Sequence, residues 1–160
     1  MSEISLVGII WDDHVNYKKY STVLEMPYCS FKCDKENGSK VCQNWALSKS
    51  KPARYGIDRI IETYLKDDIT EAIVFQGLEP FDTFEELLQF VKEFRKVCED
   101  DIVIYSGYNK NEIEYKIEEL KNYKNIIVKF GRYIPNQNSH IDEVLKVSLA
   151  SDNQYAEKIS

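Results

Sequence analysis

Long apolar runs are missing from this chain of 160 residues. No stretch approaches the roughly 20 consecutive apolar residues that a membrane-spanning helix requires, which argues against a membrane protein. The segment from Met1 to Ile10 also lacks the positively charged start and the small-residue cleavage site of a secretory signal. We therefore expect a protein of the cytoplasm that has no membrane partner.

An excess of basic residues is also missing. The formal net charge is -6, and no basic run occurs. Such a chain is a poor binder of phosphate backbones, so we set nucleic acid aside as a ligand. Hydrophobic residues make up 43% of the chain, which is ordinary for a globular protein, and the length suits one domain over 1–160.

Cysteine is scarce, with four residues in the chain, but three of the four are clustered. Cys29, Cys33 and Cys42 fall in a polar segment, 28–53. In a reducing compartment, clustered cysteines more often bind metals or act catalytically than form disulfides. Cys98 lies instead on the apolar side of a predicted helix, where a small buried hydrophobe is the simpler interpretation.

Hydrophobic periodicity divides the chain into alternating elements. The expected strands are 4–11, 21–26, 72–75, 102–105, 126–130 and 144–149. Three helices are expected: one that follows Gly56, one that runs from Phe84 towards Cys98, and one that covers Ile113 to Leu120. Asp82 or Thr83 is placed to cap the second helix. Strands that alternate with helices predict an α/β fold with a parallel sheet.

Three polar segments follow strands directly. They are the cysteine segment, the sequence Gln76-Gly-Leu-Glu-Pro80, and the sequence Ser106-Gly-Tyr108. Because ligands of parallel sheets bind at the carboxyl ends of the strands, we expect these segments to meet at one edge. This convergence is the structural reason to interpret them as one site.

The cysteines follow the pattern C-x3-C-x8-C. Thiolates bind both iron–sulfur clusters and zinc, and three thiolates leave one iron of a four-iron cluster open to another ligand. Zinc in a structural site takes four ligands, and His14 is available as a fourth, although nothing places it nearby. Spacing by itself therefore leaves an iron–sulfur cluster, a zinc site and simply buried thiols as alternatives. His14 and His140 are otherwise interpreted as surface residues.

Several segments, in order along the chain, resemble the radical S-adenosylmethionine superfamily. The loop that begins Tyr28-Cys29-Ser30-Phe31-Lys32-Cys33 and closes at Cys42 is similar to its C-x3-C-x2-C cluster loop. Gly77-Leu-Glu-Pro80 is similar to its Gly-Gly-Glu-Pro motif, and Tyr105-Ser-Gly-Tyr108 is similar to a Tyr-Thr-Gly-Tyr motif of activases. Segments 131–134 and 149–154 resemble the region around the activases' last strand. More narrowly, the chain resembles the activating protein of the anaerobic ribonucleoside-triphosphate reductase.

Two departures from the family pattern are visible. The third cysteine is displaced by six extra residues, and Leu78 replaces the second glycine. With the resemblance, the element pattern predicts a single small α/β domain, a partial (incomplete) TIM-type barrel of parallel strands with helices on the outside.

The resemblance implies a set of site residues. Cys29, Cys33 and Cys42 would bind three irons of a [4Fe–4S] cluster, and S-adenosyl-L-methionine would bind the fourth. Glu79 would accept a hydrogen bond from the methionine ammonium. The remaining cofactor contacts would come from Val41, Gln43, Gly77, Leu78 and Ser106.

The resemblance also implies an activity and its partners. The protein would be an oxidoreductase that cleaves S-adenosylmethionine reductively and generates a glycyl radical on an anaerobic ribonucleotide reductase, with reduced flavodoxin or ferredoxin as electron donor. The alternatives are another small radical enzyme or maturase with a different substrate, and a zinc-binding interaction module without catalysis.

Overall fold

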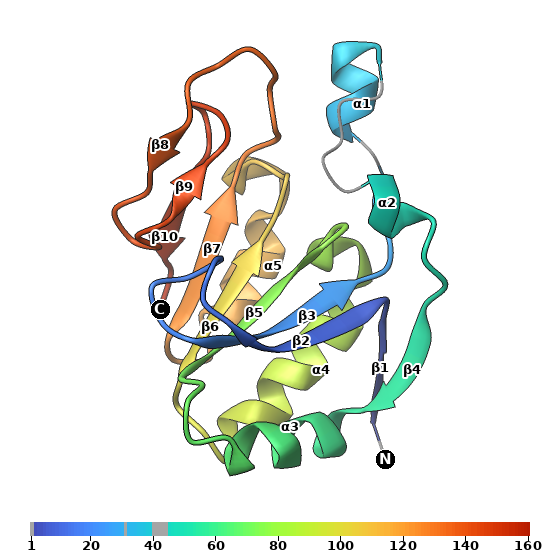
Figure 1. Ribbon diagram of the computed structural model, residues 1–160, viewed down its shortest axis with the longest axis vertical. Helices are drawn as coiled ribbons and strands as arrows, with labels where there is room; N and C mark the ends of the chain where they lie inside the picture. The colour runs from blue at the N-terminus through green and yellow to red at the C-terminus, as the bar shows by residue number, and fades with distance from the viewer. Residues whose placement is uncertain (1, 31, 40–44) are drawn as a thin grey trace.

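The computed structural model describes residues 2–30, 32–39 and 45–160 and is built around a six-stranded sheet (Figure 1). The strand order is β10-β7-β6-β5-β3-β2. The four inner strands are parallel, and each edge strand runs antiparallel to its neighbour. The strands are β2 (Gly8–Asp13), β3 (Ser21–Met26), β5 (Ala72–Gly77), β6 (Asp101–Tyr105), β7 (Ile126–Phe130) and β10 (Tyr155–Lys158).

Three helices cover one face of the sheet (Figure 1). They are α3 (Ile57–Lys66), α4 (Phe84–Arg95) and α5 (Glu114–Leu120). The apolar stripe of α4 supplies Leu87, Phe90 and Phe94, all fully buried, to the main core. Burying such side chains is the main favourable term in folding, which explains why their helical spacing predicts this element.

The opposite face of the sheet carries a second, smaller core, to which the described residues contribute no helix. Successive strand residues point to opposite faces, so Val23, Val74 and Val103 face away from the helices. Tyr17, Leu145 and other residues of loops and short strands cover them. The strands on this side are β8 (His140–Ile141) and β9 (Ser148–Leu149), which pair with each other.

The expected strand 4–11 is in fact two strands. The first, β1 (Glu3–Leu6), leaves the main sheet and pairs with β4 (Ala53–Gly56), which the sequence did not predict. Ile4 and Leu6 are buried in the core on the helix side, and β2 begins only at Gly8. The continuous apolar pattern of 4–11 was misleading because its first half pairs with β4 and its second half pairs with β3 in the main sheet.

The predicted α/β class and the parallel centre of the sheet are confirmed, but the predicted partial barrel is not. The described strands form an open sheet with antiparallel edges and no closed barrel. The expected last strand, 144–149, contributes only β9, and the edge position is taken by β10, which runs back along β7. The alternation of strands and helices predicted the parallel centre, but a short returning segment at each edge carries no such signal.

The cysteine segment contains two short helices, α1 (Lys32–Asn37) and α2 (Trp45–Ser48), where the sequence predicted a loop. Two 3-10 turns, Pro80–Thr83 and Lys110–Glu112, follow β5 and β6. Within the described residues, every helix is too short or too polar to cross a membrane.

Candidate functional site

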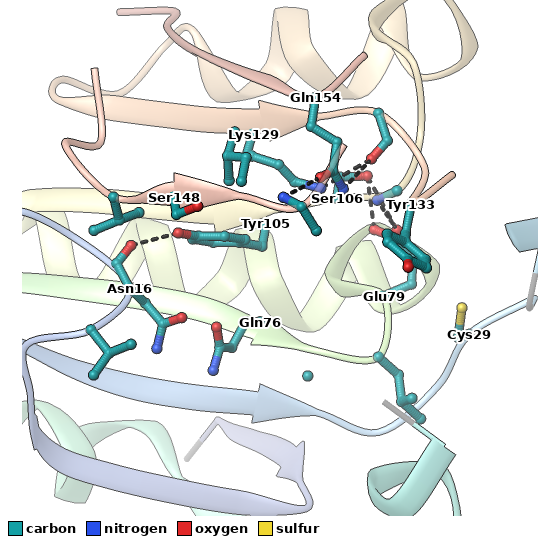
Figure 2. Close-up of a pocket in the computed structure, with 18 residues that line it drawn as sticks. Asn16, Cys29, Gln76, Glu79, Tyr105, Ser106, Lys129, Tyr133, Ser148 and Gln154 are labelled. Atoms are coloured by element: carbon teal, nitrogen blue, oxygen red, sulfur yellow. Dashed lines mark hydrogen bonds between the residues drawn. The ribbon is translucent and has the colours of Figure 1, made fainter. Parts of the chain in front are cut away.

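A cleft of about 390 Å³ lies on the face of the sheet opposite α3, α4 and α5, at the carboxyl ends of the strands. Its volume falls in the range of small-molecule sites. Figure 2 shows Glu79, Ser106 and Tyr133 towards the end nearer Cys29, and Asn16, Gln76 and Ser148 at the other end. The predicted convergence of Cys29, the segment after β5 and the segment after β6 is therefore present.

Gly77 ends β5 where two chain segments come unusually close. Its φ of +94° is rarely adopted by other residues, and a Cβ there would lie 2.8 Å from the backbone nitrogen of Met26. Beyond it, the Leu78 N–H donates to the Met26 carbonyl (3.1 Å), and the Glu79 N–H donates to the Tyr28 carbonyl (2.7 Å). Gly77 thus permits the close approach, and the N–H groups of Leu78 and Glu79 fasten the end of β5 to the end of β3 and to the start of the cysteine segment.

Glu79 is buried, with 4% of its surface exposed, and joins the ends of β5 and β6. Its carboxylate accepts hydrogen bonds from the Gly107 N–H (2.8 Å), the Ser106 hydroxyl (3.0 Å) and the Phe81 N–H (3.1 Å). Asp82 or Thr83 was predicted from the sequence to cap the helix here. In the structure, Glu79 caps the 3-10 turn before α4, and Thr83 makes no capping bond.

Burial raises the pKa of the Glu79 carboxyl from 4.5 to about 7, although the N–H groups of Gly107 and Phe81 oppose the shift. A proton bound more tightly in the folded chain stabilises the fold at low pH. This stability is lost as pH rises from about 4.5, where the unfolded carboxyl ionises, to about 7.

We expect the cluster-free protein to lose about 3 kcal/mol of unfolding free energy through Glu79 across this pH window. The measurement is chemical denaturation of the wild type and of Glu79→Gln at several pH values between 4.5 and 7.5. Glu79→Gln removes the titrating group and keeps the shape, so the difference between the two profiles isolates its contribution. Parallel profiles would contradict the prediction.

Ser106 is 1% exposed and connects Glu79 to the turn after β6. Its hydroxyl donates to the Glu79 carboxylate and accepts the Tyr108 N–H (2.9 Å). Ser106 also lines the cleft. In this structure its hydroxyl also organises the Ser106-Gly107-Tyr108 turn.

Asp82 is a residue whose role here the sequence analysis missed. One carboxylate oxygen accepts the Ser30 N–H (2.9 Å), and the other accepts the Tyr108 hydroxyl. Asp82 therefore links the residue after Cys29 to the turn that follows β6. A carboxylate shortly before a predicted helix is an ordinary capping signal, so the hydrogen-bond partners of Asp82 could not be found without the fold.

Lys129 is a second residue that the sequence analysis missed. It is 7% exposed and lines the cleft, and its ammonium donates to the Gly131 carbonyl (3.0 Å). Among the described residues that line the cleft, Glu79 and Lys129 are the two with charged side chains. The sequence did carry a signal for the polar residues on this face of the sheet. Gln76, Tyr105 and Lys129 each stand two positions after an apolar residue that faces away from the helices. Residues two positions apart on a strand point to the same face.

The predicted cluster ligands and cofactor contacts of the cysteine segment lie partly outside the residues that the structure describes. Val41, Cys42 and Gln43 lie outside the described residues, and Cys33 is described only as part of the backbone of α1. Cys29 is half-buried and lines the cleft. Within the described part of the chain, no three His, Cys, Asp or Glu side chains are grouped as a metal site.

The remaining candidates lie elsewhere. Cys98 follows α4, which ends at Arg95, and is half-buried against the main core, so its predicted place on the helix is wrong and its predicted packing is found in part. His14 is exposed, with its ring 5.5 Å from that of Tyr20. His140 is half-buried in β8.

The described residues fit a thiolate-bound cluster at this edge. Two hydrogen bonds place Cys29 beside the cleft: the Glu79 N–H donates to the Tyr28 carbonyl, and the Ser30 N–H donates to the Asp82 carboxylate. Cys33 follows on the first turn of α1, four positions later. Thiolates in this setting are the ligands that iron–sulfur clusters use.

Comparison with known proteins agrees with this donor chemistry. The family model described as "4Fe-4S single cluster domain" matches residues 20–155, nearly the whole chain. Searches of curated proteins and of solved structures find no significant match. The family model spans both the cysteine segment and the strands that line the cleft, so the chain belongs to the 4Fe–4S single cluster domain family.

Proposed function

We propose that this protein is a radical S-adenosylmethionine activase that generates a glycyl radical on an anaerobic ribonucleotide reductase in the cytoplasm. One observation carries the proposal. Cys29, the Gly77–Glu79 segment and the Ser106–Gly107 turn line the same cleft, at the carboxyl ends of adjacent parallel strands. A redox cluster and a small-molecule pocket that share one wall favour a reaction in which the cluster acts on a bound ligand.

The chain's own residues would prepare the cleft for a charged ligand. The Glu79 carboxylate, held by Ser106 and Gly107, offers negative charge to the ammonium group of S-adenosylmethionine. Lys129 offers a cationic donor to oxygen atoms of the ligand from the neighbouring part of the cleft. Gly77 and Leu78 place this binding wall against the backbone that leads into Cys29.

The cluster, held by Cys29, Cys33 and Cys42 with one iron open to the ligand, would supply one electron for cleavage of the sulfonium. In the balanced reaction, reduced flavodoxin or ferredoxin gives one electron, and S-adenosylmethionine yields methionine and 5'-deoxyadenosine. The hydrogen atom that completes 5'-deoxyadenosine comes from the α-carbon of a glycine in the partner reductase. Hydrogen-atom transfer needs no general base, and none is assigned.

Anaerobic reconstitution with iron and sulfide tests the proposal. We expect about four irons per chain, and formation of 5'-deoxyadenosine from S-adenosylmethionine after reduction with dithionite. Incubation of the reduced protein with an anaerobic ribonucleotide reductase is expected to produce the doublet signal of a glycyl radical in electron paramagnetic resonance.

Three other outcomes would overturn the proposal in different ways. A colourless protein with one tightly bound zinc would indicate an interaction module. Formation of 5'-deoxyadenosine without a glycyl signal, tested with several reductases, would indicate a radical enzyme with another substrate. A bound cluster that leaves S-adenosylmethionine intact would indicate a redox protein of another kind.

A further inference from the structure

One described residue of the stretch between Cys33 and Cys42, which is six residues longer than in the family pattern, contacts the sheet edge. It is Glu36 of α1. The Glu36 carboxylate accepts a hydrogen bond from Nε of Arg132, 2.7 Å away. Arg132 follows β7, so this ion pair joins two segments that lie 96 positions apart in the chain.

Arg132 is already held in place on its other side. Its guanidinium donates to both carboxylate oxygens of Glu112, at 2.8 and 3.2 Å, and to the Gly107 carbonyl at 3.2 Å. Glu112 is itself part of a capping box with Asn109. The Arg132 side chain is 11% exposed, so it reaches Glu36 from a nearly buried and oriented position.

A second anchor holds the beginning of the same segment. The Asp82 carboxylate accepts the Ser30 N–H, and Asp82 also binds the hydroxyl of Tyr108. One anchor thus lies directly after Cys29, and the other lies three residues after Cys33. Both connect the segment to the turn that follows β6.

We propose that Arg132 is a positioning residue for the iron–sulfur cluster. Through Glu36, Arg132 holds α1, and with it Cys33, against the ends of β6 and β7. In this interpretation the extra residues are a part of the cluster site that has its own attachment point. The inference rests on the 4Fe–4S cluster of the family, and it is independent of the proposed radical chemistry.

The two partners differ in exposure, which determines the expected effect. The Glu36 side chain is 55% exposed, so its loss should leave overall stability nearly unchanged, as for most surface ion pairs. Local opening of α1 should become more frequent, because the oriented partner Arg132 no longer retains it. The cluster would then be lost faster from a chain that is otherwise folded.

The test follows iron in anaerobically reconstituted proteins with no S-adenosylmethionine and no reductase. Wild type, Glu36→Ala, Arg132→Ala, the double variant and Lys35→Ala are mixed with a ferrous chelator, and the rate of iron release is measured. We expect about fivefold faster release in Glu36→Ala and in Arg132→Ala, and no further increase in the double variant. Lys35→Ala, an exposed neighbour on the same helix, should release iron at the wild-type rate.

Two further readouts separate positioning from folding. The electron paramagnetic resonance spectrum of the reduced cluster should change in Glu36→Ala and stay unchanged in Lys35→Ala. Thermal unfolding of cluster-free Glu36→Ala should match that of the wild type. Glu36→Ala carries the test even where Arg132→Ala fails to fold, because Arg132 keeps its bonds to Glu112 in that variant.

Equal release rates in Glu36→Ala and Lys35→Ala would overturn the inference. So would a double variant in which the two single effects multiply, since independent effects mean that the two residues do not act through each other. A failure of the activase proposal would leave these measurements unaffected, because they require the cluster alone.

Discussion

Alanine in place of Cys29, Cys33 or Cys42 is expected to abolish stable cluster binding, from about four irons per chain to nearly none. Each of the three thiolates is assigned to one iron, and a cluster that loses one of three protein ligands is left with too few bonds to the chain. The measurement is iron and sulfide content after anaerobic reconstitution and desalting, together with the visible absorption of the protein.

Cys98→Ala is the matched control for these variants. It removes the fourth cysteine of the chain, and that side chain packs against the main core, away from the cleft-lining residues. We expect its iron content to equal that of the wild type. Full iron content in Cys42→Ala, with loss in Cys98→Ala, would show that the assignment of the third ligand is wrong.

Gly77→Ala is expected to destabilise the cluster-free protein by about 4 kcal/mol. The φ of +94° is strained for alanine, and the new Cβ would lie 2.8 Å from the nitrogen and 3.0 Å from the oxygen of Met26. Both neighbours are backbone atoms of β3 and are bonded into the sheet, so they cannot move aside cheaply. Because natural domains are stable by only about 5–15 kcal/mol, such a loss would be visible in chemical denaturation at once.

Gly38→Ala separates the backbone strain of a positive φ from the steric clash with Met26. Gly38 also has a positive φ, +68°, but a Cβ there would meet nothing within 4 Å. We expect a loss of about 1 kcal/mol from backbone strain alone. Equal losses in Gly77→Ala and Gly38→Ala would mean that the close approach to Met26 does not matter for stability.

The elements that the sequence predicted well are those whose signal is local. The predicted helix that follows Gly56 corresponds to α3, and strand 126–130 corresponds to β7 with the same ends. In each case the apolar spacing within the segment matches the face that is buried. The segment 72–75 was recognised as a strand for the same reason, although β5 continues to Gly77.

The elements that could not be predicted from the sequence depend on partners that lie far away in the chain. β4 exists because β1 pairs with it, 50 residues earlier, and four residues such as Ala53–Gly56 carry no pattern of their own. The antiparallel direction of β10 is set by its pairing with β7. Arg132 and Asp82 likewise became visible as anchors only when the fold placed Glu36 and Ser30 beside them.

The kind of cofactor was indicated by the sequence alone, because the match to the 4Fe–4S single cluster domain family is a property of the chain. The residues predicted to form the wall opposite Cys29, Gly77 to Glu79 and Ser106, were also recognisable, since each follows a strand directly. Only the tertiary structure decided how that wall is held together. Burial makes Glu79 a shared acceptor of Gly107, Ser106 and Phe81, and folding brings Arg132 to Glu36. These contacts arise from long-range packing, and no local pattern in a sequence encodes which distant groups will share a buried charge.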